Sequence, residues 1–240
     1  MKHLFKINVW NSSLASVASQ GATIYAFYLV AEGHRSAMWL LMTFVVYMVI
    51  QLAVSVGLHR YYTHRAFECS RFWQYFFAIV GTLSFHASPI AFVHAHHTHH
   101  KYADTEKDSH IVGWQFFLVR RYRVPEGMNS RAIVRLTRDP FQVFLLRYGA
   151  LLCWLTFGIL FLVSPNMALF GYVAPIALYF FSTAVHQTVS HTKKGPRDLQ
   201  WLEWLLPTSE WRHAYHHNYP NRWDWGRFDI GSYFIRLIKI

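Results

Sequence analysis

Histidine is the residue type whose number and spacing stand out in this chain. Sixteen histidines occur among 240 residues, and most of them fall in four short windows. The windows are HRYYTH from His59, HAHHTHH from His94, the pair His186 and His191, and HAYHH from His213. Because imidazole is a ligand for zinc, copper, iron and nickel, windows of this kind predict a metal site.

The spacing within two windows is that of ligands on a helix. His96, His99 and His100 lie at positions i, i+3 and i+4, and a second triplet with the same spacing begins at His213. Residues at these positions are neighbours on one helical face, so three imidazoles can converge on a metal ion. The sequence therefore predicts that both windows are helical.

His59 and His64 are spaced differently. They are five residues apart, which is about 140° round an α-helix. We therefore expect a bend or a loop that lets both face one ion, or a larger site that they straddle. The whole histidine set exceeds the four ligands of a tetrahedral zinc ion. It predicts two metal ions, and the sequence chemistry alone leaves iron, copper and zinc open.

The composition places these histidines in a membrane protein. Hydrophobic residues make up 53% of the chain and charged residues 15%, whereas soluble proteins carry about 25% charged residues. A spanning helix needs about 20 mostly apolar residues. Stretches of this kind predict four spans in two hairpins, with Ser164-Pro165-Asn166 as the turn of the second hairpin. The spans are residues 14–31, 37–57, 144–163 and 167–187.

The distribution of charge predicts the orientation. Residues 58–141 hold 11 Lys and Arg, and residues 192–240 hold 8. Since cytoplasmic loops carry an excess of Lys and Arg, both segments and the N-terminus are expected on the cytoplasmic side. The uncharged stretch at 72–93 stays on that side, either lying in the interface or dipping into the bilayer. Topology and lipid contact explain the net charge of +11, and no nucleic-acid partner is expected.

Together these patterns predict an all-α integral membrane protein with a single domain over residues 1–240. Four transmembrane helices would carry a helical cytosolic cap, formed by residues 58–141 and 192–240. The cap would hold the histidine-rich site for two metals. Because the chain has two cysteines, a disulfide-rich scaffold is excluded.

The histidine windows resemble those of a known family. HRYYTH, HHTHHKYADTEKDSH and HAYHHNYP occur in this order with spans between them. This arrangement resembles the membrane-bound fatty acyl desaturases, most closely the acyl-CoA delta-9 (stearoyl-CoA) type. The resemblance implies a non-haem centre of two iron ions with nine histidine ligands. Carried over to this sequence, the ligands are His59, His64, His96, His99, His100, His191, His213, His216 and His217.

The reaction that the resemblance implies is oxygen-dependent removal of two hydrogens from a fatty acyl chain, which introduces a cis double bond. CoA, acyl carrier protein or a lipid would carry the acyl chain. Electrons would come from a separate donor, such as a cytochrome b5-like protein or a ferredoxin. The alternative is a hydroxylase or ketolase of a lipid, sterol or carotenoid on the same histidine scaffold. A metal transporter is disfavoured because the two strongest spans lack Asp, Glu, Lys and Arg.

The resemblance also implies supporting residues around the metals. Gln187 stands four residues before His191, where the family has Asn, and its amide would hold a metal-bound water. His186 is a rival for the ligand role of His191. Asp108 and His110 match a motif whose side chains orient the ligand imidazoles.

Two further features concern the acyl substrate. Gln51 lies eight residues before His59, about 12 Å along a helix, and with Tyr47 it would form the floor of the acyl channel. The alternative for Gln51 is a hydrogen bond to a neighbouring helix. The stretch from Ser209 to Arg212 replaces the family's Gly-Glu-Gly near the expected position of the acyl head, which leaves the acyl carrier open.

Overall fold

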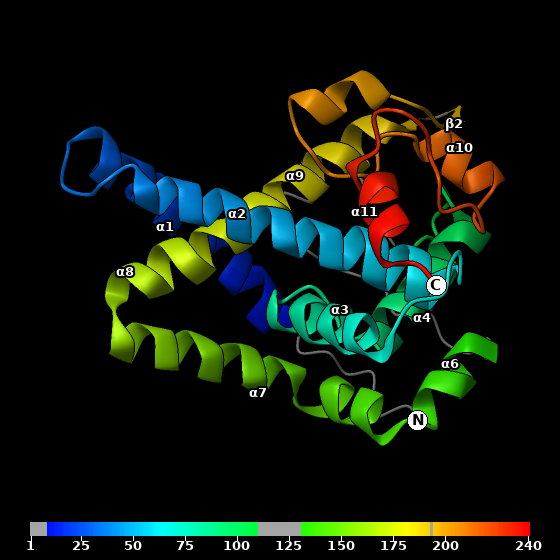
Figure 1. Ribbon diagram of the computed structural model, residues 1–240, viewed down its shortest axis with the longest axis horizontal. Helices are drawn as coiled ribbons and strands as arrows, with labels where there is room; N and C mark the ends of the chain where they lie inside the picture. The colour runs from blue at the N-terminus through cyan, green and yellow to red at the C-terminus, as the bar shows by residue number, and fades with distance from the viewer. Residues whose placement is uncertain (1–8, 110–130, 193) are drawn as a thin grey trace.

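Long helices run side by side through most of the molecule (Figure 1). The computed structural model describes residues 9–109, 131–192 and 194–240. The first hairpin consists of α1 (Val9–Ala31) and α2 (Met38–Leu52). Gly33 in the connection has a φ of 73°, which glycine adopts without strain and other residues rarely adopt.

The second hairpin breaks where the sequence predicted a turn. It consists of α7 (Pro140–Val163), α8 (Pro165–Ala168), η2 (Leu169–Val173) and α9 (Ala174–Ser190). Ser164 is extended at the break, and its side chain accepts a hydrogen bond from a main-chain N–H of the next turn. A serine cap followed by proline thus ends one helix and begins the next.

Among the described residues, three continuous helices are long and apolar enough to cross a membrane. They are Met38–Thr63, Pro140–Val163 and Pro165–Ser190. The remaining predicted span falls in α1, whose described apolar part, Val17–Ala31, is shorter. Apolar side chains are exposed on the outer faces of these helices, such as Leu162 at 86%. Exposed apolar surface of this extent fits helices that face lipid.

The uncharged stretch at 72–93 folds into α3 (Arg71–Leu83) and the first part of α4 (Pro89–Tyr102). α3 lies along α7, where the ring of Tyr75 contacts the ring of Phe141 at a centroid distance of 5.0 Å. α4 leads back from the far end of α3 to the histidines (Figure 1).

The turn between α3 and α4 lies deep in the bundle. The Sγ atom of Cys153, near the middle of α7, donates to the carbonyl oxygen of Thr82 at 3.1 Å. The hydroxyl of Tyr172, in η2, donates to the carbonyl oxygen of Leu83 at 2.6 Å. This turn therefore packs against the middle of a candidate span, and its depth in the bilayer stays a prediction.

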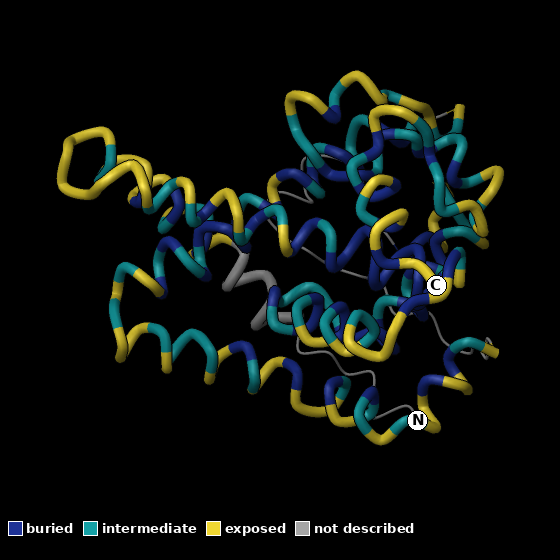
Figure 2. The backbone as a smooth tube through the Cα atoms, in the orientation of Figure 1, coloured by how far each residue is buried: buried dark blue, intermediate teal, exposed yellow. Residues whose placement is uncertain are grey.

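The remaining elements surround the end of the bundle that carries the histidines. They are the π-helix η1 (Ala53–Thr63), α6 (Arg131–Thr137), the antiparallel pair β1 (His191–Thr192) and β2 (Gly195–Pro196), the 3-10 helix η3 (Gln200–Trp204), α10 (His213–Asn218) and α11 (Ile230–Ile238). Buried residues concentrate at this end, whereas the far tips of the hairpins are exposed (Figure 2).

Candidate metal centre

Nine histidines from separate segments converge at one end of the bundle. Their ring nitrogens form two groups, and within each group the candidate ligand atoms all lie within 4.8 Å of one another. The first histidine group is His59, His64, His96, His100 and His216. The second histidine group is His99, His191, His213 and His217. The structure thus brings together all nine residues that the resemblance selects.

The π-helix η1 explains how His59 and His64 reach the same group. The main-chain N–H of His64 donates to the carbonyl oxygen of His59 at 3.1 Å, which is an i→i+5 hydrogen bond. In a π-helix, residues five apart lie about one turn apart on the same side. The two rings are 5.0 Å apart between centroids. The expected bend or loop is therefore wrong, because a wider helical turn aligns the pair.

Glycine allows η1 to be packed closely on its neighbour. A side chain on Gly57 would collide with Phe77 of α3, and one on Gly81 of α3 would collide with Leu58. The backbones of η1 and α3 can therefore approach directly, immediately before His59. This contact fixes the segment that carries the first two ligands.

Each histidine triplet is divided between the two groups. In α4, His96 and His100 belong to the first group, whereas His99 belongs to the second. Positions i+3 and i+4 point about 100° apart on an α-helix, since each residue turns the helix by that angle. The spacing alone predicted that the three imidazoles of a triplet converge on one ion. In the structure they do not, because the i+3 residue faces the other group.

The triplet of α10 is divided in the same way but with the groups exchanged. His213 and His217 belong to the second group, and His216 belongs to the first. In both helices the i and i+4 residues stay together, and the i+3 residue turns to the other group. The two helices thus bridge both groups, which ties the two sites into one centre.

The distances between ring nitrogens fit metal coordination. The Nε2 atom of His216 lies 2.9 Å from the Nε2 atoms of both His59 and His100. In the second group, Nε2 of His213 lies 2.8 Å from Nε2 of His191. Two nitrogens at about 2.05 Å from one ion, with bond angles of about 85–110°, are about 2.8–3.4 Å apart. The donor sets therefore fit metal ions.

Carboxylates fix the direction in which three of these imidazoles offer their lone pairs. Nδ1 of His99 lies 3.0 Å from both carboxylate oxygens of Asp108, and Nδ1 of His191 lies 3.0 Å from Asp104. When Nδ1–H donates to a carboxylate, the lone pair is left on Nε2. In both rings Nε2 is the atom that faces the other histidines.

A third carboxylate supports the first group. Nδ1 of His59 lies 2.9 Å from Oε1 of Glu210. Burial raises the pKa of Glu210 to about 8. The structure places the carboxyl group of the stretch from Ser209 to Arg212 at a ligand candidate of the first histidine group, and a position near the acyl head stays a prediction.

Burial keeps the imidazoles neutral. It holds the pKa values of His96, His213 and His216 well below the usual range, and neighbouring imidazoles lower them further. Because a metal competes with protons for the same nitrogen, neutral imidazoles are ready to bind it. Nε2 of His64 is also buried and has no hydrogen-bond partner among the described residues.

Three of the other predicted site residues are placed as follows. Oε1 of Gln187 is buried and lacks a hydrogen-bond partner within the described part of the chain. The rival ligand His186 is in neither group, and its Nε2 lies 3.0 Å from the carbonyl oxygen of Glu210. His110 lies outside the described residues.

Sequence reasoning missed Asp104 and Glu210 as partners of the histidines. Asp104 lies four residues after His100 and four before Asp108. A second acidic residue at that spacing was a signal for a second carboxylate partner. Glu210 lies three residues before His213, and an acidic residue beside a histidine window could have been read in the same way.

Replacing Asp108 with alanine is expected to weaken metal binding by about 10–100-fold, because loss of a carboxylate that orients a ligand imidazole has this cost. Competition with a chromophoric chelator measures the affinity. The matched control is Glu106→Ala, since Glu106 is an exposed acidic residue two positions away. Equal affinities in the two variants would contradict the role of Asp108.

A cavity of about 60 Å³ lies directly below the histidines. Its upper end is lined by His96, His213 and Glu210, and its far end by His86, Tyr179 and Gln51. Val54 and Phe92 add apolar walls. The cavity therefore leads from the metal centre along the helices into the bundle.

Gln51 both lines this cavity and bonds a neighbouring helix. Its Nε2 donates to the hydroxyl of Ser182 in α9 at 2.5 Å and to the hydroxyl of Tyr47 at 3.1 Å. Tyr47 in turn donates to the carbonyl oxygen of Pro207 at 2.9 Å and lies behind Gln51, away from the cavity wall. Gln51 therefore bonds a neighbouring helix and also lines the cavity, and its place at the floor of an acyl channel stays a prediction.

The comparisons with known proteins agree with the predicted resemblance to desaturases. No family model matches the chain. It is 25% identical over 241 residues to delta-9 acyl-lipid desaturase 1 of Arabidopsis thaliana, covering 91% of this chain and 79% of the relative. It is 26% identical to the acyl-CoA delta(11) desaturase of Trichoplusia ni, over 91% of this chain and 68% of the relative.

A bacterial relative extends the agreement. The chain is 24% identical to the sn-1 stearoyl-lipid 9-desaturase of Anabaena variabilis, over 79% of this chain and 76% of the relative. Proteins named as desaturases are oxidoreductases, and all three match this chain across most of its length. The predicted resemblance is confirmed, and the chain is an oxidoreductase related to the delta-9 acyl desaturases.

Proposed function

We propose that this protein desaturates a fatty acyl chain with molecular oxygen at a centre of two iron ions. The observation that carries the proposal is the pair of histidine groups, with nitrogen spacings that suit metal coordination, at the head of an elongated cavity. The desaturase relatives supply the reaction class.

In this proposal one ion is held by the first histidine group and the other by the second. Gln187 would accept a hydrogen bond from a water molecule at the second site through its unpartnered Oε1. Bound iron would supply the oxygen activation that oxidation of an unactivated chain requires. The chain's own carboxylates, Asp104, Asp108 and Glu210, hold the imidazoles in the orientation that binding needs.

The cavity would position the substrate. An acyl chain that enters from the histidine end would pass between Val54 and Phe92 and point toward Gln51. The walls exclude water from the reacting carbons, and the fixed shape selects which two carbons lie nearest the metal centre. Two hydrogens leave the chain, a separate donor supplies two electrons, and with two protons one oxygen molecule becomes two water molecules while the cis double bond forms.

The topology that supports this function has α1 as the fourth span. The three longer candidate spans and α1 would then place the histidine end, both termini and the cap on the cytoplasmic side, where basic residues are concentrated. A soluble or membrane-bound electron donor and the acyl carrier, whether CoA, acyl carrier protein or lipid, would approach from that side.

The test is metal analysis of the purified protein combined with fatty-acid profiling of expressing cells. Two irons per chain and new monounsaturated acyl chains are the expected result. One zinc without any change in lipids would overturn the proposal. A hydroxylated or keto product with two irons would retain the metal centre and replace desaturation by the alternative reaction.

Replacing Gln51 with alanine is expected to shift product chain length or double-bond position, because it enlarges the far end of the cavity. Gas chromatography with mass spectrometry of product derivatives measures both. Tyr47→Phe is the control, since it removes the Gln51–Tyr47 hydrogen bond without changing the cavity wall. Unchanged products and normal activity in Gln51→Ala would remove Gln51 from the channel floor.

A further inference from the structure

The segment that follows β2 carries an apolar surface on its outside. Trp201, Trp204 and Leu205 are 65%, 80% and 78% exposed. The ring of Trp204 has a neighbouring aromatic ring in Phe228, at a centroid distance of 6.1 Å. Two exposed tryptophans and a leucine within five residues are unusual on a surface that faces water.

The charged residue of this segment is turned inward. Glu203 is the one ionisable residue between Leu199 and Ser209, and it is 5% exposed. Both of its carboxylate oxygens accept the main-chain N–H of Ser209, at 2.9 and 3.0 Å. The segment therefore hides its carboxyl group and presents its apolar side chains, which is the reverse of a loop in water.

The segment also lies beside a candidate membrane span. The carbonyl oxygen of Pro207 accepts from the hydroxyl of Tyr47, and that of Ser209 accepts from the hydroxyl of Ser55 at 3.2 Å. Tyr47 and Ser55 belong to the candidate span Met38–Thr63. Tyr47 lies six residues before η1, about 9 Å along α2, and His59 lies further along η1, so the segment descends well below the histidines.

Figure 1 shows the same placement from outside. In this view the orange segment between β2 and α10 lies above α9, at the outside of the molecule. Its main chain bonds within itself, since the N–H groups of Leu205 and Leu206 both donate to the carbonyl oxygen of Leu202, at 3.0 and 2.8 Å. The Nε1–H group of Trp211 donates a hydrogen bond to the carbonyl oxygen of Leu206 at 2.7 Å. Satisfied backbone groups are what a segment in a bilayer requires.

We propose that residues 200–207 form a lipid-contacting element that enters the bilayer beside α9, with Trp201, Trp204 and Leu205 against lipid. Tryptophan is enriched where a membrane protein meets the lipid interface. The same segment leads directly into Thr208 and Glu210, which line the cavity below the histidines. The bilayer thus supports one wall of that cavity from outside.

Spin labels on single cysteines in lipid nanodiscs test this placement. The variant is Trp204→Cys, and the native cysteines, Cys69 and Cys153, are buried. Leu162→Cys on the outer face of α7 is the lipid-facing control, and Arg222→Cys is the water-facing control. We expect the label at 204 to collide with dissolved oxygen several-fold more than with an aqueous nickel chelate, as at 162.

Accessibility to the nickel chelate equal to that at 222 would overturn the proposal. Strong dipolar broadening at 204, together with exclusion of both oxygen and the nickel chelate, would also overturn the proposal. A second copy of the chain, and not lipid, would then cover residues 200–207. Leu205→Cys repeats the measurement independently where Trp204→Cys does not fold. The readout needs neither bound metal nor enzyme activity, so it stands apart from the proposed desaturation.

Discussion

Replacing His216 with alanine is expected to remove metal from the first histidine group and to abolish oxidation of the acyl chain. Nε2 of His216 lies 2.9 Å from Nε2 of both His59 and His100, so this imidazole is central to the group. Loss of a partner that only orients a ligand already costs about 10–100-fold in affinity. Loss of His216 itself is expected to cost more than about 100-fold.

Metal content per chain, measured by mass spectrometry of the purified protein, checks this expectation alongside product analysis. His97→Ala is the matched control: His97 lies in the same window as His96 and His100 but is in neither histidine group. It is expected to keep both metals and its products. Since His216 is wholly buried, His100→Ala serves as a second variant at a less buried ligand. Full metal content in both ligand variants would contradict the assignment.

The helices and the ligands could be predicted because each leaves a local pattern. Uncharged stretches and the helix-breaking pair Ser164-Pro165 predicted the second hairpin. In the structure α7 ends and α8 begins at this pair. The three ordered windows selected eight of the nine histidines that the structure gathers, and the family pattern after the last span selected the ninth, His191. Each of these signals lies within a few neighbouring residues, so one sequence is enough to detect it.

The details of the centre could not be predicted, because they depend on the backbone and on distant segments. The π-helix at His59 and His64 is set by its i→i+5 hydrogen bonds, which side-chain periodicity does not reveal. Asp104 meets His191 across 87 residues, and Glu210 meets His59 across 151 residues. Their places beside histidine windows mark them as carboxylate partners, but nothing local in the sequence tells which histidine each of them meets.

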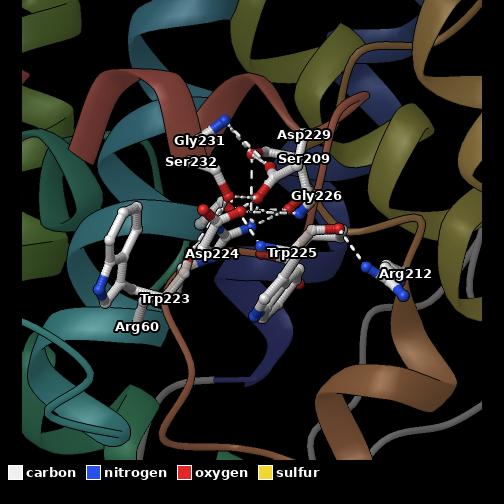
Figure 3. A network of polar contacts seen from close by, with 12 residues as sticks. Arg60, Ser209, Arg212, Trp223, Asp224, Trp225, Gly226, Asp229, Gly231 and Ser232 are labelled. Carbon is white, nitrogen blue, oxygen red and sulfur yellow. Dashed lines mark hydrogen bonds and ion pairs between the residues drawn. The ribbon is translucent and has the colours of Figure 1, made fainter. Parts of the chain in front are cut away.

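A buried ion pair joins the metal centre to the C-terminal segment (Figure 3). Arg60, directly after His59, is 0% exposed, and its two terminal nitrogens donate to the carboxylate of Asp229 at 2.6 and 3.1 Å. Its guanidinium lies 3.6 Å from the ring centroid of Trp225 and donates to the carbonyl oxygen of Ser209 at 2.5 Å. The hydroxyls of Ser209 and Ser232 also donate to Asp229.

Replacing Asp229 with alanine is expected to destabilise the protein by about 3–5 kcal/mol, because it leaves the Arg60 charge buried without a partner. Equilibrium unfolding in detergent measures the change. Asp224→Ala is the matched control, since Asp224 pairs with Arg236 at 2.7 Å where both side chains are substantially exposed. Its loss is expected to cost less than about 1 kcal/mol. Equal costs for the two variants would contradict the prediction.

The double variant Arg60→Met with Asp229→Leu separates two effects of the ion pair. One is its effect on stability, and the other is its effect on the link between η1 and Ser209. Replacing both partners of a buried pair by apolar residues is often neutral for stability, so we expect the double variant to recover much of the loss in Asp229→Ala. Metal affinity is expected to stay reduced, because Arg60 links η1 to Ser209, and Ser209 precedes the Glu210 that meets His59. Wild-type affinity in a stable double variant would show that the pair serves folding alone.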